Sequence, residues 1–407
     1  MLTRRHFIKS LAAAAGCSLL PMRGNAFALY GPDVAQHRLV VLLLRGAVDG
    51  LSVVVPYHER EYYNVRHNIA LQPPGTQDGV VDLDGFFGLH PSLSNLMPLW
   101  QDKSLAFVHA SGFPTNVRSH FEAQDIIETA CLNPTSRGWM NSLIGLLPDT
   151  RSPMRAVTFS RTLPKIFTGR YNVAVAPPNM NAKSKEIFTN PQVEGAFDSL
   201  YASNPQLSTL FKEGKDSHNQ MVGDLQKEMA SSGRNAPFPN GFPGEAARLA
   251  AMIKQDPNIE LAFMDVGGWD THVGQGNAKG QLSEHLRHLA EGLAALINGL
   301  GPQYGNTTIM VMSEFGRTVA ENGNNGTDHG HGNVIWLMGG GVQGGKVHGR
   351  WPGLARNQLF EQRDLAVTTD FRSVIGSVLT SRFGLDTARI AQAIPDYQPD
   401  NGLSLFT

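Results

Sequence analysis

Five continuous apolar runs, each broken off by polar or glycine-rich residues, dominate the hydrophobic pattern of this chain. They span residues 39–44, 105–109, 261–266, 307–312 and 333–338. Aliphatic and β-branched runs of this length predict strands that are buried on both faces. Helical patterns lie between them. The clearest covers residues 281–300, where leucines recur every three or four positions until glycine and proline follow. This alternation predicts an α/β fold with a central, mostly parallel sheet covered by helices on both faces.

The polar segments that follow these runs are the first place to look for a site, because ligands of such sheets bind beyond the carboxyl ends of the strands. In chain order the segments are RGAVDG, ASGFPTNVRSH, GGWDTH, SEFGR and GGG. We therefore expect all five segments to gather at one edge of the sheet.

The densest candidate is SEFGRTVAENGNNGTDHGHG, residues 313–332, which joins the last two runs. Carboxylates and imidazoles are the ligands that a divalent transition metal requires. The segment supplies five candidate side chains: Glu314, Arg317, Asp328, His329 and His331. Arg317 can bind an oxyanion through two parallel hydrogen bonds. The alternative is a polar surface loop in which Glu314 and Arg317 form an ordinary salt bridge of little energetic weight.

Two further strand ends offer metal ligands. Asp49 follows the first run beside Gly50 and can turn its carboxylate towards an ion, although Asp-Gly is also a favoured turn pair. Asp270 and His272 follow the third run, two positions apart. On an extended backbone both side chains point to one side and can chelate one ion. A surface turn is the alternative for this pair.

A serine near the start of an expected helix is the candidate nucleophile. Ser119 begins a helical pattern that runs to residue 130, and Arg118 adjoins it as a candidate for binding an oxyanion. Helix N-termini stabilise anions, and a metal can activate a serine there. Ser119 equally has the Ser-x-x-Glu spacing of a capping box with Glu122. Three more side chains can face the same neighbourhood: His109, His120 and Asp125.

The first 28 residues predict export by the twin-arginine route. Residues 3–9 read TRRHFIK, an apolar stretch follows, and Ala26-Phe27-Ala28 gives a cleavage pattern. The stretch is too short for a stable membrane span. A lipoprotein signal through Cys17 is the alternative. The mature protein is therefore expected to be periplasmic or secreted, and with Cys131 as its remaining cysteine it forms no intrachain disulfide.

Charge and composition narrow the partners and the domain plan. The chain carries 34 basic and 35 acidic residues, which argues against nucleic acid or an anionic membrane surface as a partner. Residues 29–407 are expected to form one α/β domain. Within it, the polar, Gly- and Pro-rich region 181–246 is interpreted as an inserted cap or lid, with a flexible connection as the alternative.

The motifs together resemble a known family. LRGAVDGL, RSHFEAQD, GGWDTH, SEFGRT, GTDHGHGN and GGGVQGGKVHGRWPGL, in this order, resemble the exported bacterial proteins of the DUF1501 family. That family is similar to the alkaline phosphatase and sulfatase superfamily, whose members place one or two metal ions and a helix-start nucleophile at the carboxyl edge of a parallel sheet. The resemblance implies an alkaline-phosphatase-like fold, divalent ions (zinc first, with manganese, magnesium or calcium as alternatives) and a small-molecule or polymer ester substrate. It also implies a co-encoded exported protein of the DUF1800 type as a partner.

The resemblance assigns roles to individual residues. Asp49 would match an early metal-binding Asp, and Ser119 the nucleophile. Asp270 with His272 would match the ligands of one ion, Glu314 an acid of the other, and His329 or His331 a further ligand. Arg118 or Arg317 would be the oxyanion clamp. The chain departs from alkaline phosphatases by Asp-x-His in place of Asp-x-x-x-His and by Glu314-Phe315 in place of Asp-His, and it lacks the Cys/Ser-x-Pro-x-Arg motif of sulfatases.

Two functions follow as expectations. The first is an exported metal-dependent hydrolase of phosphate or sulfate esters that uses Ser119 as a metal-activated nucleophile. The second is a non-catalytic exported binding or assembly protein that keeps the fold and a structural metal.

Overall fold

A computed structural model describes residues 37–148, 154–176, 233–400 and 402–407. The predicted signal peptide lies outside the described residues, and so does the predicted insertion except for its last residues from 233 onwards. Among the described helices, none combines the length and the apolar character that a membrane crossing requires.

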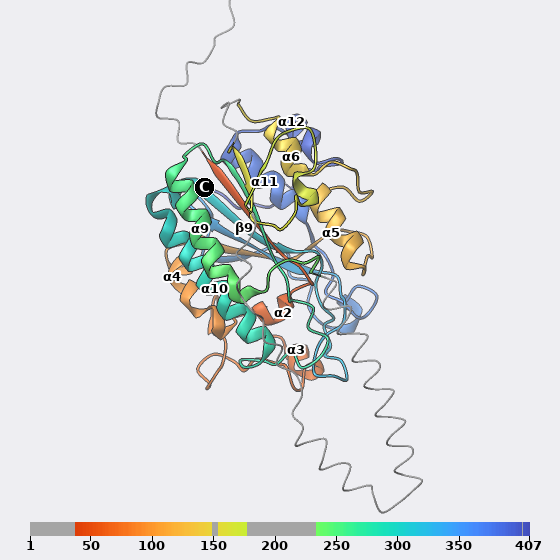
Figure 1. Cartoon of the computed structure of the whole chain (residues 1–407). Coiled ribbons are helices and arrows are strands. Elements are labelled where there is room, and N and C mark those ends of the chain that lie inside the picture. Colours follow the sequence, from red (N-terminus) through yellow and green to blue (C-terminus); the bar gives the residue numbers. More distant parts are fainter. Residues whose placement is uncertain (1–36, 149–153, 177–232, 401) are drawn as a thin grey trace, which may run out of the picture. The chain divides into compact units, whose positions relative to one another are not determined.

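All five predicted apolar runs are strands of one nine-stranded sheet (Figure 1). Their order is β11-β5-β10-β9-β1-β8-β6-β7, and β12 pairs with β5. β1 pairs in parallel with β8 and β9, and β6 pairs in parallel with β8, so the prediction of a mostly parallel sheet is confirmed. The strands are β1 (Arg38–Leu44), β5 (Leu105–Gly112), β6 (Ala156–Thr158), β7 (Ala174–Val175), β8 (Leu261–Val266), β9 (Thr307–Ser313), β10 (Asn333–Gly339), β11 (Lys346–His348) and β12 (Thr369–Asp370).

Among the described strands of this sheet, β10 alone runs against its neighbours. It pairs antiparallel with both β9 and β5. The start of β10 therefore lies at the edge where β9 ends, and the segment DHGHG, which precedes β10, faces that edge. The glycines after β10, which were expected at the same edge, lie at the opposite one. That part of the prediction was wrong because an apolar run has the same pattern in either direction.

Helices cover both faces of the sheet (Figure 1), as predicted. Alternate residues of β1 enter different cores: Val41 packs in one cluster and Leu42 in the other. The first core holds α5 (His120–Thr129), α6 (Trp139–Ile144), α11 (Phe371–Phe383) and α12 (Thr387–Ala393). The second holds α4 (Met97–Gln101), α9 (Phe242–Gln255) and α10 (Gln281–Leu300). The bounds of α10 are those that the leucine pattern predicts.

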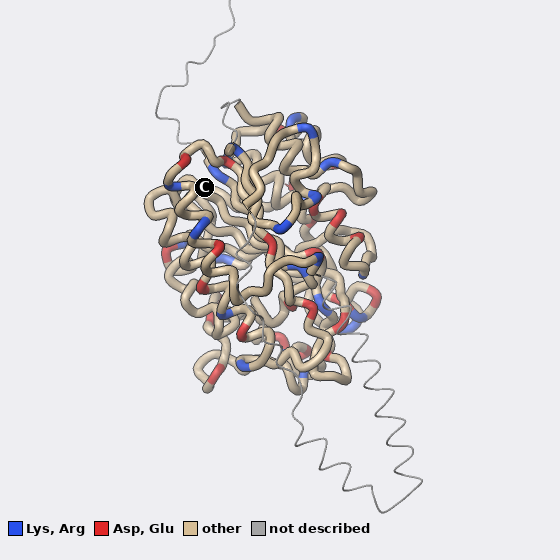
Figure 2. The backbone as a smooth tube through the Cα atoms, in the orientation of Figure 1, with Lys and Arg blue, Asp and Glu red and all other residues tan. Residues whose placement is uncertain are grey.

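Short elements complete the described part. A small antiparallel sheet has the order β2-β4-β3. The short elements are β2 (Val54–Val55), β3 (Val81–Asp82), β4 (Gly88–Leu89), α2 (Gly50–Val53), α3 (Arg60–Val65), and the 3-10 turns η1 (Pro91–Leu96), η2 (Lys165–Phe167), η3 (Pro239–Gly241), η4 (Gly301–Asn306) and η5 (Arg356–Gln358). Acidic and basic positions are interspersed along the described backbone (Figure 2), in keeping with the balanced charge of the sequence.

Candidate metal centre

The loop between β9 and β10 extends the hairpin of these two strands beyond the sheet. Arg317 and His329 form an antiparallel bridge, and the backbone N–H of Gly316 donates to the carbonyl of His331 at 2.8 Å. A side chain at Gly316 would overlap the carbonyl of Gly332, so the two arms approach this closely only because position 316 has no Cβ. The pairing fixes His329 at the carboxyl edge of the sheet.

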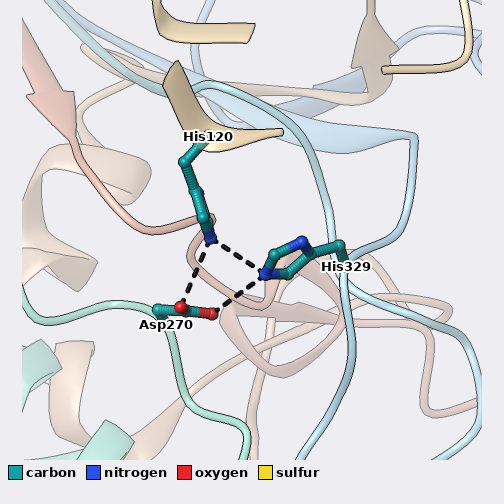
Figure 3. Close-up of side chains that lie close together, drawn as sticks. All are labelled: His120, Asp270 and His329. Atoms are coloured by element: carbon teal, nitrogen blue, oxygen red, sulfur yellow. Dashed lines mark hydrogen bonds and ion pairs between the residues drawn. The ribbon is translucent and has the colours of Figure 1, made fainter. Parts of the chain in front are cut away.

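Three side chains from separate parts of the chain converge at this edge (Figure 3). His120 is the first residue of α5, Asp270 follows β8, and His329 lies on the hairpin loop. One ligand atom from each lies within 4.8 Å of the others. His120 Nε2 is 2.9 Å from His329 Nε2 and 3.3 Å from Asp270 Oδ2, and His329 Nε2 is 3.4 Å from Asp270 Oδ1. Ligand atoms around a tetrahedral ion with bonds of about 2.0–2.1 Å are about 3.3 Å apart, close to these distances.

His272 adjoins the group from the other side of His329. Its Nε2 lies 3.0 Å from His329 Nε2 and 3.0 Å from Asp270 Oδ1. Asp270 therefore presents Oδ2 to His120 and Oδ1 to the other two imidazoles. The predicted pair of Asp270 and His272 thus lies together, and His120 and His329 join it.

Each imidazole is held from outside by an acceptor at its Nδ1. Glu314 Oε1 lies 2.8 Å from Nδ1 of His120, and Asp328 Oδ1 lies 3.1 Å from Nδ1 of His272. The backbone carbonyl of Arg118 lies 2.7 Å from Nδ1 of His329. These acceptors favour a proton on every Nδ1 and leave the Nε2 lone pairs for the centre, as around metal-ligating histidines generally.

Asp270 has a buried oxygen that lacks a hydrogen bond. Its Oδ1 accepts from Nη1 of the buried Arg317 at 2.5 Å. Its Oδ2 is buried and accepts no hydrogen bond of good geometry from any described residue. Burial would raise the pKa of Asp270, but the close imidazoles of His120, His272 and His329 and the charge of Arg317 lower it. An ionised carboxylate with an unused buried oxygen is what a cation ligand requires.

The surrounding charge also suits a cation. Burial would raise the pKa of Glu314, but the hydrogen bond and charge of His120 lower it to about 2. The hydrogen bond from His272 lowers the pKa of Asp328 to about 2. Burial, together with the charge of Arg317, lowers the pKa of His329. Three ionised carboxylates therefore surround the imidazoles. In the metal-free chain they are balanced by the guanidinium of Arg317 and by His120 and His272, whose pKa values they raise.

One family profile covers most of the chain. The profile described as "Protein of unknown function (DUF1501)" matches residues 36–394. The chain belongs to the DUF1501 family. The membership that the motifs predict is thereby confirmed. No curated protein sequence matches this DUF1501 chain closely enough to count as a relative.

Solved structures with a similar arrangement share little sequence with this DUF1501 chain. One is Ps i-CgsB in complex with k-i-k-neocarrahexaose, with a TM-score of 0.43 and 10% identity over 88% of this chain and 74% of that one. Another is the C-terminal periplasmic domain of EcEptC from Escherichia coli, with a TM-score of 0.43 and 10% identity over 90% and 88%. A third is a protein in the alkaline phosphatase superfamily from Vibrio parahaemolyticus, with a TM-score of 0.36 and 9% identity over 77% and 62%.

Asp49, a predicted ligand, is not part of the converging group in this DUF1501 chain. Its carboxylate is buried and is bound on both oxygens by Arg66. Oδ2 also accepts from Ser52 Oγ and Gln275 Nε2, each at 2.7 Å. Burial would raise the pKa of Asp49, but the charge of Arg66 lowers it. A guanidinium therefore occupies the place that the resemblance gives to a metal ion.

Glu314, another predicted ligand, lies behind the imidazole of His120 rather than within the converging group. Its Oε1 accepts from the backbone N–H of Gly46 and from Gln124 Nε2, both at 2.8 Å, besides facing His120. Its Oε2 accepts from Ser313 Oγ at 3.0 Å. Asp328 has the same kind of role towards His272. The structure therefore brings both acids to the outer side of imidazoles.

His331 is turned away from the centre. Its ring stacks on Phe360, with centroids 4.2 Å apart. Arg317 is buried against Asp270 and Thr327, so its guanidinium already has partners. The guanidinium of Arg118 is about one third exposed and pairs with Glu361 and Asp364.

Ser119 is exposed at the N-cap position of α5, immediately before His120, and its side chain makes no capping hydrogen bond. The capping box that its spacing with Glu122 suggested does not form. His120 itself was noted only as a neighbour in the sequence. The signal that points to it is the spacing of His120, Gln124 and Glu128, three buried polar residues four positions apart on one helix face.

Proposed function

We propose that the protein is a metal-dependent hydrolase of phosphate or sulfate esters, in which His120, Asp270 and His329 bind one divalent ion and His272 completes the site. The observation that carries the proposal is the convergence of two imidazole nitrogens and a buried carboxylate within 4.8 Å at the carboxyl edge of the sheet. Two further features support a bound cation: the unused Oδ2 of Asp270 and the acceptor behind each imidazole.

The ligand chemistry favours zinc. Imidazole nitrogen with one carboxylate is a set that suits zinc, whereas magnesium and calcium prefer oxygen ligands. One ion is favoured over two, because Asp49 is paired with Arg66 and Oε1 of Glu314 already has three polar neighbours.

The residues around the centre have separate tasks in this proposal. A bound divalent ion supplies Lewis-acid polarisation of an ester oxygen. Ser119 stands exposed beside His120. Its hydroxyl can attack phosphorus or sulfur, the bond to the ester's alcohol breaks, and the alcohol leaves with the serine proton. Water then hydrolyses the seryl ester and frees phosphate or sulfate. Arg317 holds the Asp270 carboxylate in place from the buried side. Arg118 provides a partly exposed guanidinium for the charge of the ester group.

The experiment is metal analysis followed by an ester screen on the purified mature chain. We expect about one zinc ion per chain after reconstitution, and turnover of an aryl phosphate monoester, phosphodiester or sulfate ester. His329→Ala should lose the ion and the turnover, and Ser119→Ala should lose the turnover while keeping the ion. Background metal content in the folded wild type would refute the proposal, as would unchanged turnover in Ser119→Ala.

A second candidate function is a non-catalytic exported binding or assembly protein with a structural metal. The observation that favours it is that His120, the imidazole next to Ser119, is already engaged by Glu314 and Asp270. Stoichiometric metal without turnover of any ester, in a chain that retains its fold, would support this alternative. The DUF1800-type partner remains a prediction, to be checked by co-purification.

A further inference from the structure

A buried chain of polar contacts leads from the centre along one face of α5. His120, Gln124 and Glu128 are all buried on that face. Arg45, which follows β1 directly, donates from Nη1 to Gln124 Oε1 and to Glu128 Oε1, each at 2.9 Å. Arg45 Nε also donates to Asp265 Oδ2 on β8 at 2.7 Å. The arginine is thus fixed by two carboxylates and in turn contacts the glutamine.

These contacts determine which way the amide of Gln124 faces. A guanidinium has donors and no acceptor, so the amide oxygen must face Arg45. The NH₂ group then faces Glu314, where Nε2 donates to Oε1 at 2.8 Å. The reverse orientation would put the amide oxygen against a carboxylate and the NH₂ group against a guanidinium. Neither contact is a hydrogen bond.

The same carboxylate oxygen is the acceptor behind His120. Glu314 Oε1 lies 2.8 Å from His120 Nδ1 and also accepts from the backbone N–H of Gly46 at 2.8 Å. The two fixed donors, Gln124 and Gly46, hold the carboxylate at the position where it meets the imidazole. Without Gln124, the Gly46 N–H would still donate to Oε1 and Ser313 Oγ to Oε2, but the side-chain donor beside the imidazole on Oε1 would be lost.

We propose that Gln124, oriented by Arg45, is a positioning residue that acts through Glu314 to keep the proton of His120 on Nδ1 and to present its Nε2 to the metal ion. The inference rests on the proposed function, because it takes His120 as a ligand. It adds that ion affinity depends on a side chain that does not touch the centre. Partners behind ligating histidines contribute about 10–100-fold to metal affinity in other proteins.

The test measures zinc affinity of the mature full chain by competition with a chromophoric chelator. For Gln124→Met we expect affinity about 10-fold weaker than wild type, the lower end of the effect of a direct partner, because Gln124 acts through Glu314. Asn141→Leu is the matched control. It removes a buried amide that bonds the carbonyls of Phe167 and Tyr171 in another part of the fold, so it should lower the unfolding midpoint and leave the affinity unchanged.

A double-mutant cycle tests whether Gln124 acts through Glu314. In a Glu314→Gln background, adding Gln124→Met should weaken zinc binding much less than it does in the wild type, because the carboxylate it acts on is gone. Full additivity of the two effects would overturn the inference. So would a Gln124→Met protein that is destabilised but binds zinc as wild type does, since that is the result of a purely structural role.

Gln124→Glu is the second variant, because it keeps the shape and the acceptor for Arg45. Its new carboxylate is paired with Arg45 and has no proton to donate to Glu314, so its zinc affinity should be weaker than that of wild type. A zinc affinity equal to that of wild type would contradict the inference. Failure of the wild type to bind zinc would refute the proposed function instead, so the two failures are distinguishable.

Discussion

Asp49 and Arg66 form a fully buried ion pair with two parallel contacts. Nη1 of Arg66 lies 2.6 Å from Oδ2 of Asp49, Nη2 lies 3.0 Å from Oδ1, and both side chains have no exposed surface. Arg66 also donates to the backbone carbonyls of Thr318 and Val319, at the start of the hairpin loop. The pair therefore ties the end of β1 to the loop that carries His329.

Removing Arg66 should destabilise the fold strongly. Arg66→Ala leaves the Asp49 carboxylate buried without its cation, which costs about 3–5 kcal/mol of unfolding free energy. Urea unfolding followed by circular dichroism measures the loss. The control is Arg287→Ala, which breaks exposed pairs with Glu284 and Glu291 on α10 and should cost less than about 1 kcal/mol. Equal losses of unfolding free energy in the two variants would contradict the prediction that the buried pair stabilises the fold more than the exposed pairs do.

Metal content should distinguish ligands from buried acids. We expect His329→Ala to retain only background zinc, because one of the three converging atoms is lost. Asp49→Asn should keep the ion, because Asp49 is bound by Arg66 and lies outside the group. Elemental analysis of both folded proteins after dialysis gives the answer. Loss of the ion in a folded Asp49→Asn protein would mean that Asp49 is a ligand after all.

Zinc affinity should rise with pH. Burial would lower the pKa of His120, but its hydrogen bonds to Asp270 and Glu314 and the charge of these carboxylates raise it to about 9. His329 also contacts His120, and Arg317 binds Asp270 from the other side. In the metal-free chain the contribution of protonated His120 to stability is complete below pH 6.5 and is lost as pH rises to about 9. Zinc must displace this proton.

Affinity is therefore expected to increase from pH 6.5 and to level off above pH 9. Calorimetry in buffers of different ionisation enthalpy should detect at least about one proton released per ion at pH 7.5, because the pKa of His272 is raised as well. An affinity that stayed constant over this range would argue against His120 as a ligand.

Export should depend on the paired arginines. Replacing Arg4 and Arg5 by lysine in the full-length chain should leave the precursor in the cytoplasm, because the twin-arginine route recognises the pair. Fractionation and immunoblotting follow the protein. Replacement of Arg23 by lysine, near the end of the same segment, is the control and should leave export unchanged. Equal export of all three proteins would remove the basis for this route.

Most of the fold could be predicted from the sequence, because the apolar runs of buried strands and the leucine pattern of α10 are local signals. The direction of β10 has no local signal in the sequence, since an apolar run has the same pattern in either direction. The candidate site residues also divide into those with a local signal in the sequence and those without one. Asp270, His272 and His329 stand next to strands and can be predicted. The partner of Asp49 is 17 residues away on the other side of α3, and its choice depends on how the loops pack. His120 was not predicted as a ligand, because the adjacent Ser119 was the candidate nucleophile and His120 was named only as its neighbour.

The antiparallel direction of β10 makes the loop that carries His329 a separate hairpin tip, which can vary while the sheet stays the same. Because β9 and β10 are paired neighbours, the intervening loop leaves and re-enters the sheet at one edge. Its length can therefore change during evolution without shifting the register of any strand, and loop closure becomes only slowly more costly with length. Asp328 and His329 both lie on this loop. Related chains can thus exchange this one hairpin tip, and His329 with it, while His120 on α5 and Asp270 after β8 stay where the sheet puts them.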